Sequence, residues 1–545
     1  MKKLTLFLAI TLLTSCATRV NKPINYDFWK SANLYFLMTD RFSNGDKSND
    51  VNFGRTEKTG VLRGFEGGDL RGIINKIDEN YFTDLGVNAI WMTPIVEQIH
   101  GATNEGTGNT YGFHGYWTKD WSEIDPNFGT KTDLKELVDK AHQKGIKVIL
   151  DAVINHTGPV TKSDEVYPNS WVRTSPQCTY NNYEHTTACT LVANLPDILT
   201  ESNSPAELPT MLVEKWKKEG KYSQEIASLD AFFAKNKLPR APKFYIMKWL
   251  TDYIREYGID GYRIDTAKHV NEDTWKVFQQ LCQEAFDQYK ANHPNQIKDN
   301  TPFFTVGEVY GYGISQKQNY NFGDRIVNYY NNGFSALINF DFKGDANQSY
   351  EKLFSNYDQI LKNDLNGFTV MNYLTSHDDS WPFDKKREKT YEAGTKLLLT
   401  PGISQIYYGD ETARSLEITG TQGDATLRSN MNWQDVKTNP ETQKLLAYYQ
   451  KLGKFRAEHP AIGAGKHQLI SKNPYWFSRK IDNIDFSDKV YIGLDLPKGI
   501  KSVAIPSFPE GSKLRDAYSG KTTKIINGIA TIDTDFPIVL FEKLK

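Results

Sequence analysis

The fold of this chain is decided at Gly258-Ile259-Asp260-Gly261-Tyr262-Arg263-Ile264-Asp265-Thr266-Ala267-Lys268-His269. Residues 259–264 are suited to a short buried strand, and they follow a segment with apolar residues at helical spacing that ends at Gly258. A buried parallel strand is usually apolar throughout, yet Arg263 and Asp265 lie two positions apart and point to the same side. In a barrel of strands and helices, Asp265 would lie at the active-site face, with Arg263 keeping it ionised. A buried ion pair that only fixes the core is the alternative interpretation.

Length and composition set the first limits on function. The chain has 545 residues, enough for a barrel with additional domains, and a formal net charge of −1. This charge gives no case for binding nucleic acid or an anionic membrane surface. The aromatic content of 13%, with 11 Trp and 30 Tyr, suits stacking on sugar rings, but a large core explains it equally well.

The N-terminus has the pattern of an export signal. Lys2-Lys3 precedes an apolar run at residues 4–13 that is too short to span a bilayer. The run ends in Leu13-Thr14-Ser15-Cys16, which resembles a bacterial lipoprotein cleavage box, so residues 1–16 are predicted to be a lipoprotein signal peptide and Cys16 the lipidated first residue. Residues 17–30 would form a tether. An ordinary secretory signal is the alternative, and either interpretation predicts that the protein leaves the cytoplasm. The lipoprotein interpretation adds a lipid anchor in a membrane of the cell envelope, on the periplasmic side or at the cell surface.

Eight short apolar runs alternate with helical patterns along the chain. Besides residues 259–264, these strand candidates are residues 34–38, 86–94, 146–153, 303–307, 336–340, 368–373 and 402–408. This alternation predicts a (β/α)8 TIM barrel, an α/β fold, formed by residues 31–156 and 241–460. Residues 157–240 break the rhythm after the third strand and are predicted to form an inserted domain B. Residues 461–545 alternate without helices, which predicts a C-terminal antiparallel β-sandwich.

The remaining cysteines predict no zinc site. Cys178 and Cys189 lie close together in a polar stretch and would close a small loop in an oxidising compartment. Cys282 shares a helical stripe with aromatic residues, so we expect a buried apolar role for its side chain.

Three carboxylates fall at or just after the ends of separate predicted strands, at Asp265, Glu308 and Asp378. Two carboxylates on either side of a bond, one protonated and one ionised, are the equipment of retaining glycoside hydrolysis. The third would hydrogen-bond to ring hydroxyls in the transition state. His156 and His377 lie at strand ends as well, where they would donate to sugar hydroxyls.

A loop rich in side-chain oxygens, residues 43–50, follows the first strand, and Glu66-Gly67-Gly68-Asp69 offers further oxygens. Such a loop is compatible with Ca²⁺, although Val51 occupies the position where an EF-hand counted from Asp40 would need Glu. A solvated polar turn is the alternative.

Several motifs together resemble the α-amylase family, glycoside hydrolase family 13. Four match its signature regions in the family's order: Asp151-Ala-Val-Ile-Asn155-His156, Gly261 to His269, Gly307-Glu308-Val309 and Ser376-His377-Asp378. Residues 86–94, 195–197 and 402–411 are similar to its accessory regions. The resemblance extends from about Leu34 to about His459. It departs from the family pattern at Ser376, where Asn is usual, and at Ile198, where Leu is common.

The resemblance implies a role for each matched residue. Asp265 would be the nucleophile, Glu308 the general acid/base and Asp378 the stabiliser of the transition state. Substrate contacts are implied for His114, Tyr116, His156, Arg263, Lys268 and His377. The pair Lys268-His269 is typical of α-amylases and cyclodextrin glucanotransferases and favours long α-1,4-glucans.

Calcium is the cofactor that the resemblance implies, at two sets of residues. The first matches an N-terminal calcium loop and comprises Asn44, Asp46, Asn49, Asp50, Gly67 and Asp69. The second would join the inserted domain to the barrel and comprises Asn155, Asp197 and His269, the last through its carbonyl.

These patterns predict endo-type, retaining hydrolysis of α-1,4 bonds in starch-like glucans and maltooligosaccharides. A transglycosylase with the same residues, in which a sugar takes the intermediate, is one alternative. A non-catalytic glucan-binding lipoprotein is another, and the intact Asp265, Glu308 and Asp378 argue against it. No protein partner is implied.

Overall fold

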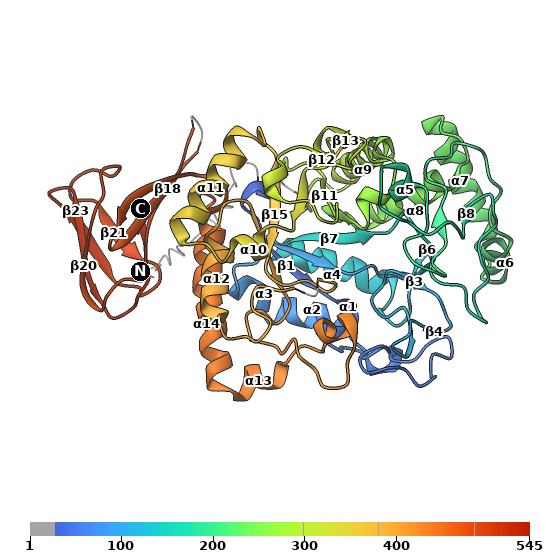
Figure 1. The fold of residues 1–545 in the computed structure, drawn as a ribbon, viewed down its shortest axis with the longest axis horizontal. Helices are drawn as coiled ribbons and strands as arrows, with labels where there is room; N and C mark the ends of the chain where they lie inside the picture. The colour runs from blue at the N-terminus through green and yellow to red at the C-terminus, as the bar shows by residue number, and fades with distance from the viewer. Residues whose placement is uncertain (1–27, 298, 380, 484–485, 545) are drawn as a thin grey trace, which may run out of the picture.

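The centre of the molecule is a closed barrel of eight parallel strands (Figure 1). The computed structural model describes residues 28–544 apart from 298, 380 and 484–485, so the predicted signal peptide, Cys16 and most of the predicted tether lie outside the described residues. All eight strand predictions are confirmed. Around the barrel the strands are β1 (Asn33–Leu37), β16 (Ile403–Tyr407), β15 (Thr369–Tyr373), β14 (Ala336–Asn339), β11 (Phe304–Gly307), β10 (Gly261–Ile264), β7 (Lys147–Ala152) and β2 (Ala89–Met92).

Local sequence explains where the helices around the barrel begin and end. The helix before β10 has Pro242 in its first turn, where a missing N–H costs nothing, and ends at Gly258 in the left-handed conformation. Another begins with a capping box between Thr130 and Asp133. The longer helices of the barrel are α2 (Leu70–Asp78), α4 (Lys131–Gln143), α8 (Pro242–Tyr257), α9 (Glu272–Asn292), α11 (Tyr350–Asn363), α12 (Thr390–Leu399) and α14 (Pro440–Glu458).

The segment between β7 and α8 carries its own small elements, at the position predicted for the inserted domain and at the end of the molecule opposite the C-terminal strands (Figure 1). They are β8 (Val172–Arg173), α5 (Glu184–Thr187), β9 (Asp197–Ile198), α6 (Thr210–Lys218) and α7 (Tyr222–Asn236). Cys178 and Cys189, whose pairing the sequence left open, form a disulfide, and Cys282 is a buried free thiol as expected.

Short elements complete the barrel domain. The strands are β3 (Val96–Gln98), β4 (Thr103–Asn104), β5 (Asn109–Thr110), β6 (Thr118–Ile124), β12 (Tyr320–Asn321) and β13 (Ile326–Val327). The helices are α1 (Thr39–Phe42), α3 (Tyr81–Asp84), α10 (Phe342–Asp345), α13 (Trp433–Thr438) and α15 (Ala461–Ala464), with 3₁₀ turns at Phe28–Ser31, Lys47–Asn49, Ala267–His269, Ile314–Gln316, Tyr330–Asn332 and Gly423–Arg428.

The C-terminal residues form an antiparallel sheet, as predicted. Hydrogen bonds link its eight strands in one order, and apolar residues from both halves of this order pack against each other in one core. In sequence order they are β17 (Lys466–Lys472), β18 (Tyr475–Asp482), β19 (Ser487–Leu494), β20 (Gly499–Ala504), β21 (Lys513–Asp516), β22 (Thr522–Ile526), β23 (Ile529–Thr534) and β24 (Val539–Lys543). Within residues 28–544, as far as they are described, no helix is long and apolar enough to cross a bilayer.

Candidate active site

Arg263 lies at the centre of a charged cluster at the carboxyl end of the barrel, where its guanidinium contacts three acids. Strand pairing places it beside Asp151 of β7, and its Nη1 lies 3.0 Å from Asp151 Oδ1 and 2.7 Å from Asp265 Oδ1. Its Nη2 lies 2.9 Å from Glu308 Oε2. One planar guanidinium therefore holds the predicted nucleophile and the predicted acid/base side by side, in a site where all four side chains are buried.

Glu308 has the environment of a carboxylic acid that stays protonated. Burial is the largest cause that raises its pKa well above the ordinary value; Arg263 opposes this, and the charges of Asp265 and Asp378 add to it. The Thr266 N–H donates to Glu308 Oε2 at 2.8 Å. Thr266 has a φ of 47°, a strained conformation for a β-branched residue, and such strain is commonly kept at functional sites.

The third predicted catalytic carboxylate, Asp378, has a side chain that is 35% exposed at the mouth of the site. Ser376 Oγ lies 3.3 Å from Asp378 Oδ1 and 3.3 Å from His377 Nδ1, so this Ser contacts both neighbours at the position where the family usually has Asn. Arg428 Nε donates to the His377 carbonyl at 2.9 Å and fixes this turn.

Tyr116 and three histidines that are predicted to bind sugar, His114, His156 and His377, form one group of rings. The Tyr116 ring stacks on His377 with ring centroids 5.2 Å apart, and Tyr116 OH donates to Asp151 Oδ2 at 2.8 Å. His114 Nδ1 accepts from the Tyr116 N–H at 3.1 Å, and His156 Nε2 lies 3.1 Å from the Tyr116 carbonyl. Burial lowers the pKa of His114, His156 and His377, so the three rings are neutral hydrogen-bonding groups near pH 7.

Lys268 lies on the Glu308 side of the site, among tyrosines. Its Nζ donates to the Tyr310 carbonyl at 3.1 Å and lies 5.3 Å from the centroid of the Tyr310 ring. The rings of Tyr180 and Tyr320 are within 6 Å of the same ammonium group. The structure thus brings together all the predicted catalytic and substrate-binding residues at one end of the barrel, and it separates the predicted calcium ligands into two other places.

The N-terminal calcium candidates have a donor set that fits a hard cation. Asn49 Oδ1 is buried and has no hydrogen-bond partner within the described part of the chain. A Cβ on Gly67 would lie 2.4 Å from Asn44 Nδ2 and 2.6 Å from Asp50 Oδ1, so the loop is tightly packed here, and Asn44 Nδ2 donates to Asp50 Oδ1 at 2.8 Å. The unpaired Asn49 amide oxygen and the neighbouring carboxylates offer the oxygen ligands that Ca²⁺ prefers. Asp46 and Asp69 act as helix caps at the same loop.

The second set of predicted calcium ligands, Asn155, Asp197 and His269, fits a cation less well than the first set. Asn155 Oδ1 is buried without a hydrogen-bond partner among the residues that the structure describes, as a cation ligand would be. However, Arg173 Nε lies 2.9 Å from Asp197 Oδ2, so a guanidinium already faces this carboxylate. His269 is close by on the Ala267–His269 turn, and its Nδ1 contacts the Thr186 carbonyl at 3.0 Å.

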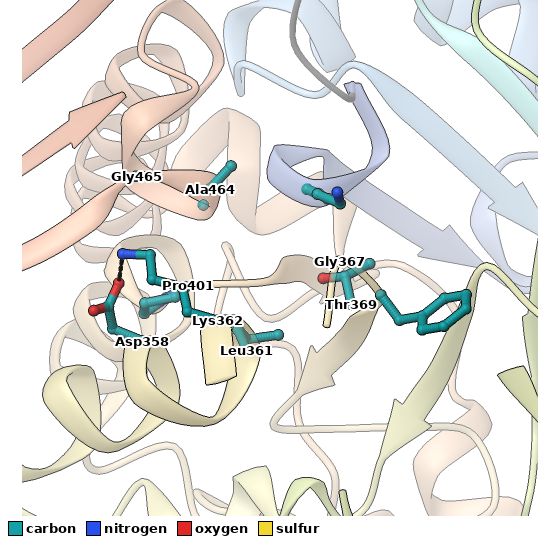
Figure 2. Close-up of a pocket in the computed structure, with 11 residues that line it drawn as sticks. Asp358, Leu361, Lys362, Gly367, Thr369, Pro401, Ala464 and Gly465 are labelled. Carbon is teal, nitrogen blue, oxygen red and sulfur yellow. Dashed lines mark hydrogen bonds and ion pairs between the residues drawn. The ribbon is translucent and has the colours of Figure 1, made fainter. Parts of the chain in front are cut away.

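A cavity of about 270 Å³ lies away from these groups, at the amino ends of β15 and β16 (Figure 2). Thr369 at the start of β15 and Pro401 just before β16 line it, with the paired Lys362 and Asp358 of α11 at one side. Catalytic residues of this barrel architecture gather at the opposite, carboxyl ends of the strands. This cavity is therefore separate from the catalytic cluster.

Several residues at the site carry contacts that sequence patterns did not indicate. Asp151 belongs to one of the family-like motifs, but the motif does not indicate its buried contacts. An acid inside an apolar strand does indicate that a buried partner exists. Trp91 Nε1 donates to Asp151 Oδ2 at 3.2 Å. Arg173 and Arg428 had no recognisable local signal, because each pairs with a residue far away in the sequence.

Comparisons with known proteins place the same residues in a wider context. The sequence model of the family Alpha-amylase, described as the alpha amylase catalytic domain, matches residues 36–439, which is more than half of the chain. The chain is 36% identical over 531 residues to the periplasmic alpha-amylase of Escherichia coli (strain K12), covering 86% of this chain and 73% of that protein. It is 27% identical to a cyclomaltodextrin glucanotransferase of Geobacillus stearothermophilus, covering 82% of this chain and 57% of the relative.

Solved structures agree with the fold. The structure of an Anoxybacillus alpha-amylase has 25% sequence identity and a TM-score of 0.64, covering 95% of this chain and 99% of that one. An alpha-amylase from Geobacillus thermoleovorans, solved in complex with acarbose, has 23% identity, a TM-score of 0.64 and the same coverage, and it supports the fold alone.

Proposed function

This chain belongs to the α-amylase family and is a glycoside hydrolase, and we propose that it cleaves internal α-1,4-glucosidic bonds in starch-like glucans and maltooligosaccharides. The observation that carries this proposal is the Arg263 guanidinium, which contacts Asp265 and Glu308 together in a buried site. An ionised carboxylate next to a protonated one is what two-step retaining hydrolysis requires.

In the first step, Asp265 attacks the anomeric carbon while Glu308 gives its proton to the glycosidic oxygen. The bond to the leaving sugar breaks, and a glucosyl ester forms on Asp265. In the second step, Glu308 takes a proton from water, the water oxygen attacks the same carbon, and the ester bond breaks. Two displacements at one carbon return the original α configuration.

The surrounding residues would hold the glucose unit on which this chemistry occurs. We propose that Asp378 binds ring hydroxyls more strongly as the ring flattens in the transition state. His156 and His377, both neutral, would hydrogen-bond to hydroxyls, and Tyr116 would stack on the ring face. The His114 ring would position Tyr116, because its Nδ1 accepts a hydrogen bond from the Tyr116 backbone N–H.

We also propose that Ca²⁺ binds the N-terminal loop through Asn44, Asn49, Asp50 and the Gly67 carbonyl, with Asp46 and Asp69 at its edge. Its contribution there would be to stabilise the loop, which lies apart from the reacting carboxylates. The second set, Asn155, Asp197 and His269, is proposed as a weaker site because Arg173 already offsets the charge of Asp197.

Export is part of the same proposal. The Escherichia coli relative is described as periplasmic, and the Cys178–Cys189 disulfide is typical of an oxidising compartment. The sequence pattern at residues 13–16 is the support for a lipid anchor on Cys16.

Transglycosylation is the second candidate activity. The support is the similarity to cyclomaltodextrin glucanotransferases together with the tyrosines around Lys268, which would hold an acceptor sugar where a leaving sugar departs. An acceptor hydroxyl would then replace water in the second step.

Incubation of the purified protein with soluble starch, a cyclodextrin and pullulan tests the proposal. Short maltooligosaccharides released in the α form, followed by nuclear magnetic resonance before mutarotation, are the expected products from starch. Cyclic or lengthened products would favour the transferase, and β-configured products would exclude the retaining mechanism. Binding of starch without any product would overturn the assignment of Asp265, Glu308 and Asp378.

A further inference from the structure

Trp381 has the highest exposed fraction, 81%, of the exposed large hydrophobic side chains in the described chain. It lies three positions after Asp378, on the loop that follows β15. A single exposed aliphatic residue is common on protein surfaces. A highly exposed indole close in sequence to the predicted catalytic Asp378 is different, because it offers a large flat apolar face to a ligand. We propose that Trp381 is a stacking platform for a glucose unit in the leaving-group part of the glucan substrate, and this inference rests on the proposed function.

A row of contacts connects the residues beside Glu308 with the backbone of Trp381. The Tyr310 and Phe340 rings lie 5.0 Å apart, and Phe340 lies 5.7 Å from Tyr373. Tyr373 OH donates to Asp379 Oδ2 at 2.6 Å, and the Trp381 N–H donates to Asp379 Oδ1 at 3.2 Å. This row of contacts follows the neighbouring strands β11, β14 and β15 around the barrel rim and ends at Trp381.

The Glu308 side is where the leaving sugar must be. Glu308 protonates the oxygen that departs, so the released part of the chain begins next to its carboxyl group. Tyr310, two residues after Glu308, is 51% exposed and lies next to Lys268. A glucan that extends from Glu308 past Tyr310 therefore approaches the rim that carries Trp381.

Hydrogen bonds on the loop after β15 fix the backbone at Trp381 and Phe383. Asp379, which accepts from the Trp381 backbone, is also ion-paired with Lys343 and is itself buried. On the other side, the Phe383 N–H donates to the Leu374 carbonyl at 3.0 Å, and the Phe383 ring packs against the barrel core. These contacts hold the loop backbone, and an aromatic side chain has only two rotatable bonds to fix when a ligand stacks on it, which suits a binding platform.

The test compares a substrate that fills the leaving-group side with one that does not. Maltoheptaose places glucose units beyond the cleaved bond, whereas α-maltotriosyl fluoride has only fluoride there. Trp381→Ala is expected to lower kcat/KM for maltoheptaose roughly five- to tenfold, mainly through KM, and to leave kcat/KM for the fluoride unchanged. Trp381→Phe should retain most of the activity, because it keeps a flat ring.

Phe536→Ala is the matched control, since it removes an exposed aromatic from the C-terminal domain and should change neither substrate. Equal losses on both substrates would show that Trp381 acts through the catalytic residues or on the other side of the cleaved bond, and no loss on either would leave it without a substrate role; both results overturn the proposal. The proposed function fails separately, if the unaltered enzyme turns over neither maltoheptaose nor the fluoride.

Discussion

Arg263 is the residue of the site that is ion-paired with three carboxylates at once. A buried guanidinium is costly to desolvate, and here the cost is offset by contacts to Asp151, Asp265 and Glu308. Because three acids share one cation, the cluster holds more negative than positive charge when all are ionised. Proton uptake by Glu308 relieves this excess, and the same proton is what the leaving oxygen needs.

Replacement of Glu308 by Gln tests its role as a proton donor. Glu308→Gln removes the proton but keeps the shape, so kcat/KM for maltoheptaose should fall by about 10²–10⁴-fold. With α-maltotriosyl fluoride, which needs no proton to leave, the first step should proceed and the glucosyl ester on Asp265 should accumulate.

Azide provides the decisive measurement for this variant. As a nucleophile that needs no general base, it should release the ester and restore turnover, with an α-glucosyl azide as the product. Absence of both ester and azide product, in a variant with unchanged melting temperature, would contradict the role of Glu308. Asp265→Asn is the companion variant, and it should lose turnover of maltoheptaose while retaining substrate binding, and no ester should accumulate from the fluoride.

The pH profile depends on the same carboxyl group. Because the pKa of Glu308 is raised, the protonated form persists to higher pH, and kcat/KM for maltoheptaose should fall only as pH rises through this pKa. The fluoride substrate should show a much weaker decline on the alkaline side, since its cleavage needs no acid. Identical alkaline limbs for the two substrates would assign the decline to another group.

At the scale of elements, the strands were predictable and the loops were only partly so. Each barrel strand is a short apolar run between polar ones, and the spacing of Arg263 and Asp265 at the end of β10 favours a functional cluster at this face but fits an ion pair that only fixes the core equally well. By contrast, Arg173 on β8 meets Asp197 on β9, and the order of the strands in the C-terminal domain depends on which strands pair. Such pairings are set by tertiary contacts, for which a sequence segment has no local pattern.

The N-terminal loop should make stability depend on calcium. Removal of calcium with a chelator should lower the melting temperature, since a ligand at 100 times its dissociation constant stabilises by about 2.7 kcal/mol. Asp50→Ala removes one of the oxygens that face Gly67 and should abolish most of this response. Asp535→Ala, an exposed acid in the C-terminal domain, should leave the response intact. Equal responses in all three proteins would exclude the loop as the calcium site.

The Arg173–Asp197 ion pair between β8 and β9 leads to a different prediction for the second set of calcium candidates, Asn155, Asp197 and His269. If Arg173 occupies the place of a cation, Arg173→Met should increase the number of calcium ions bound per chain in isothermal titration calorimetry. Asn155 Oδ1 and the Asp197 carboxylate are then the ligands released for it. An unchanged number of ions would show that these oxygens do not form a calcium site with or without the guanidinium.

At the scale of the whole molecule, the C-terminal sheet is attached to the barrel at the end of α14. Arg479 of β18 reaches the Ile462 carbonyl of α15 at 2.6 Å, and His459, which follows α14, contacts two carboxylates of the sheet. His459 Nδ1 lies 2.8 Å from Asp488 Oδ1, and Nε2 lies 2.8 Å from Glu542 Oε2. Both ring nitrogens are thus occupied by acids, so the ring serves as a cation between the two domains.

This junction should weaken at alkaline pH. The two carboxylates raise the pKa of His459 to about 9 against the opposing effect of burial, so the folded protein binds the proton more tightly than the unfolded chain, whose histidine titrates near 6.5. The stabilisation, about 3 kcal/mol, is therefore complete below pH 6.5 and is lost as pH rises through 9. His459→Gln should lower the melting temperature by several degrees at pH 6 and by little at pH 10, whereas His293→Gln at the end of α9 should show no such trend. A constant difference between the His459 variant and the unaltered protein from pH 6 to 10 would show that the ring binds the sheet as a neutral group.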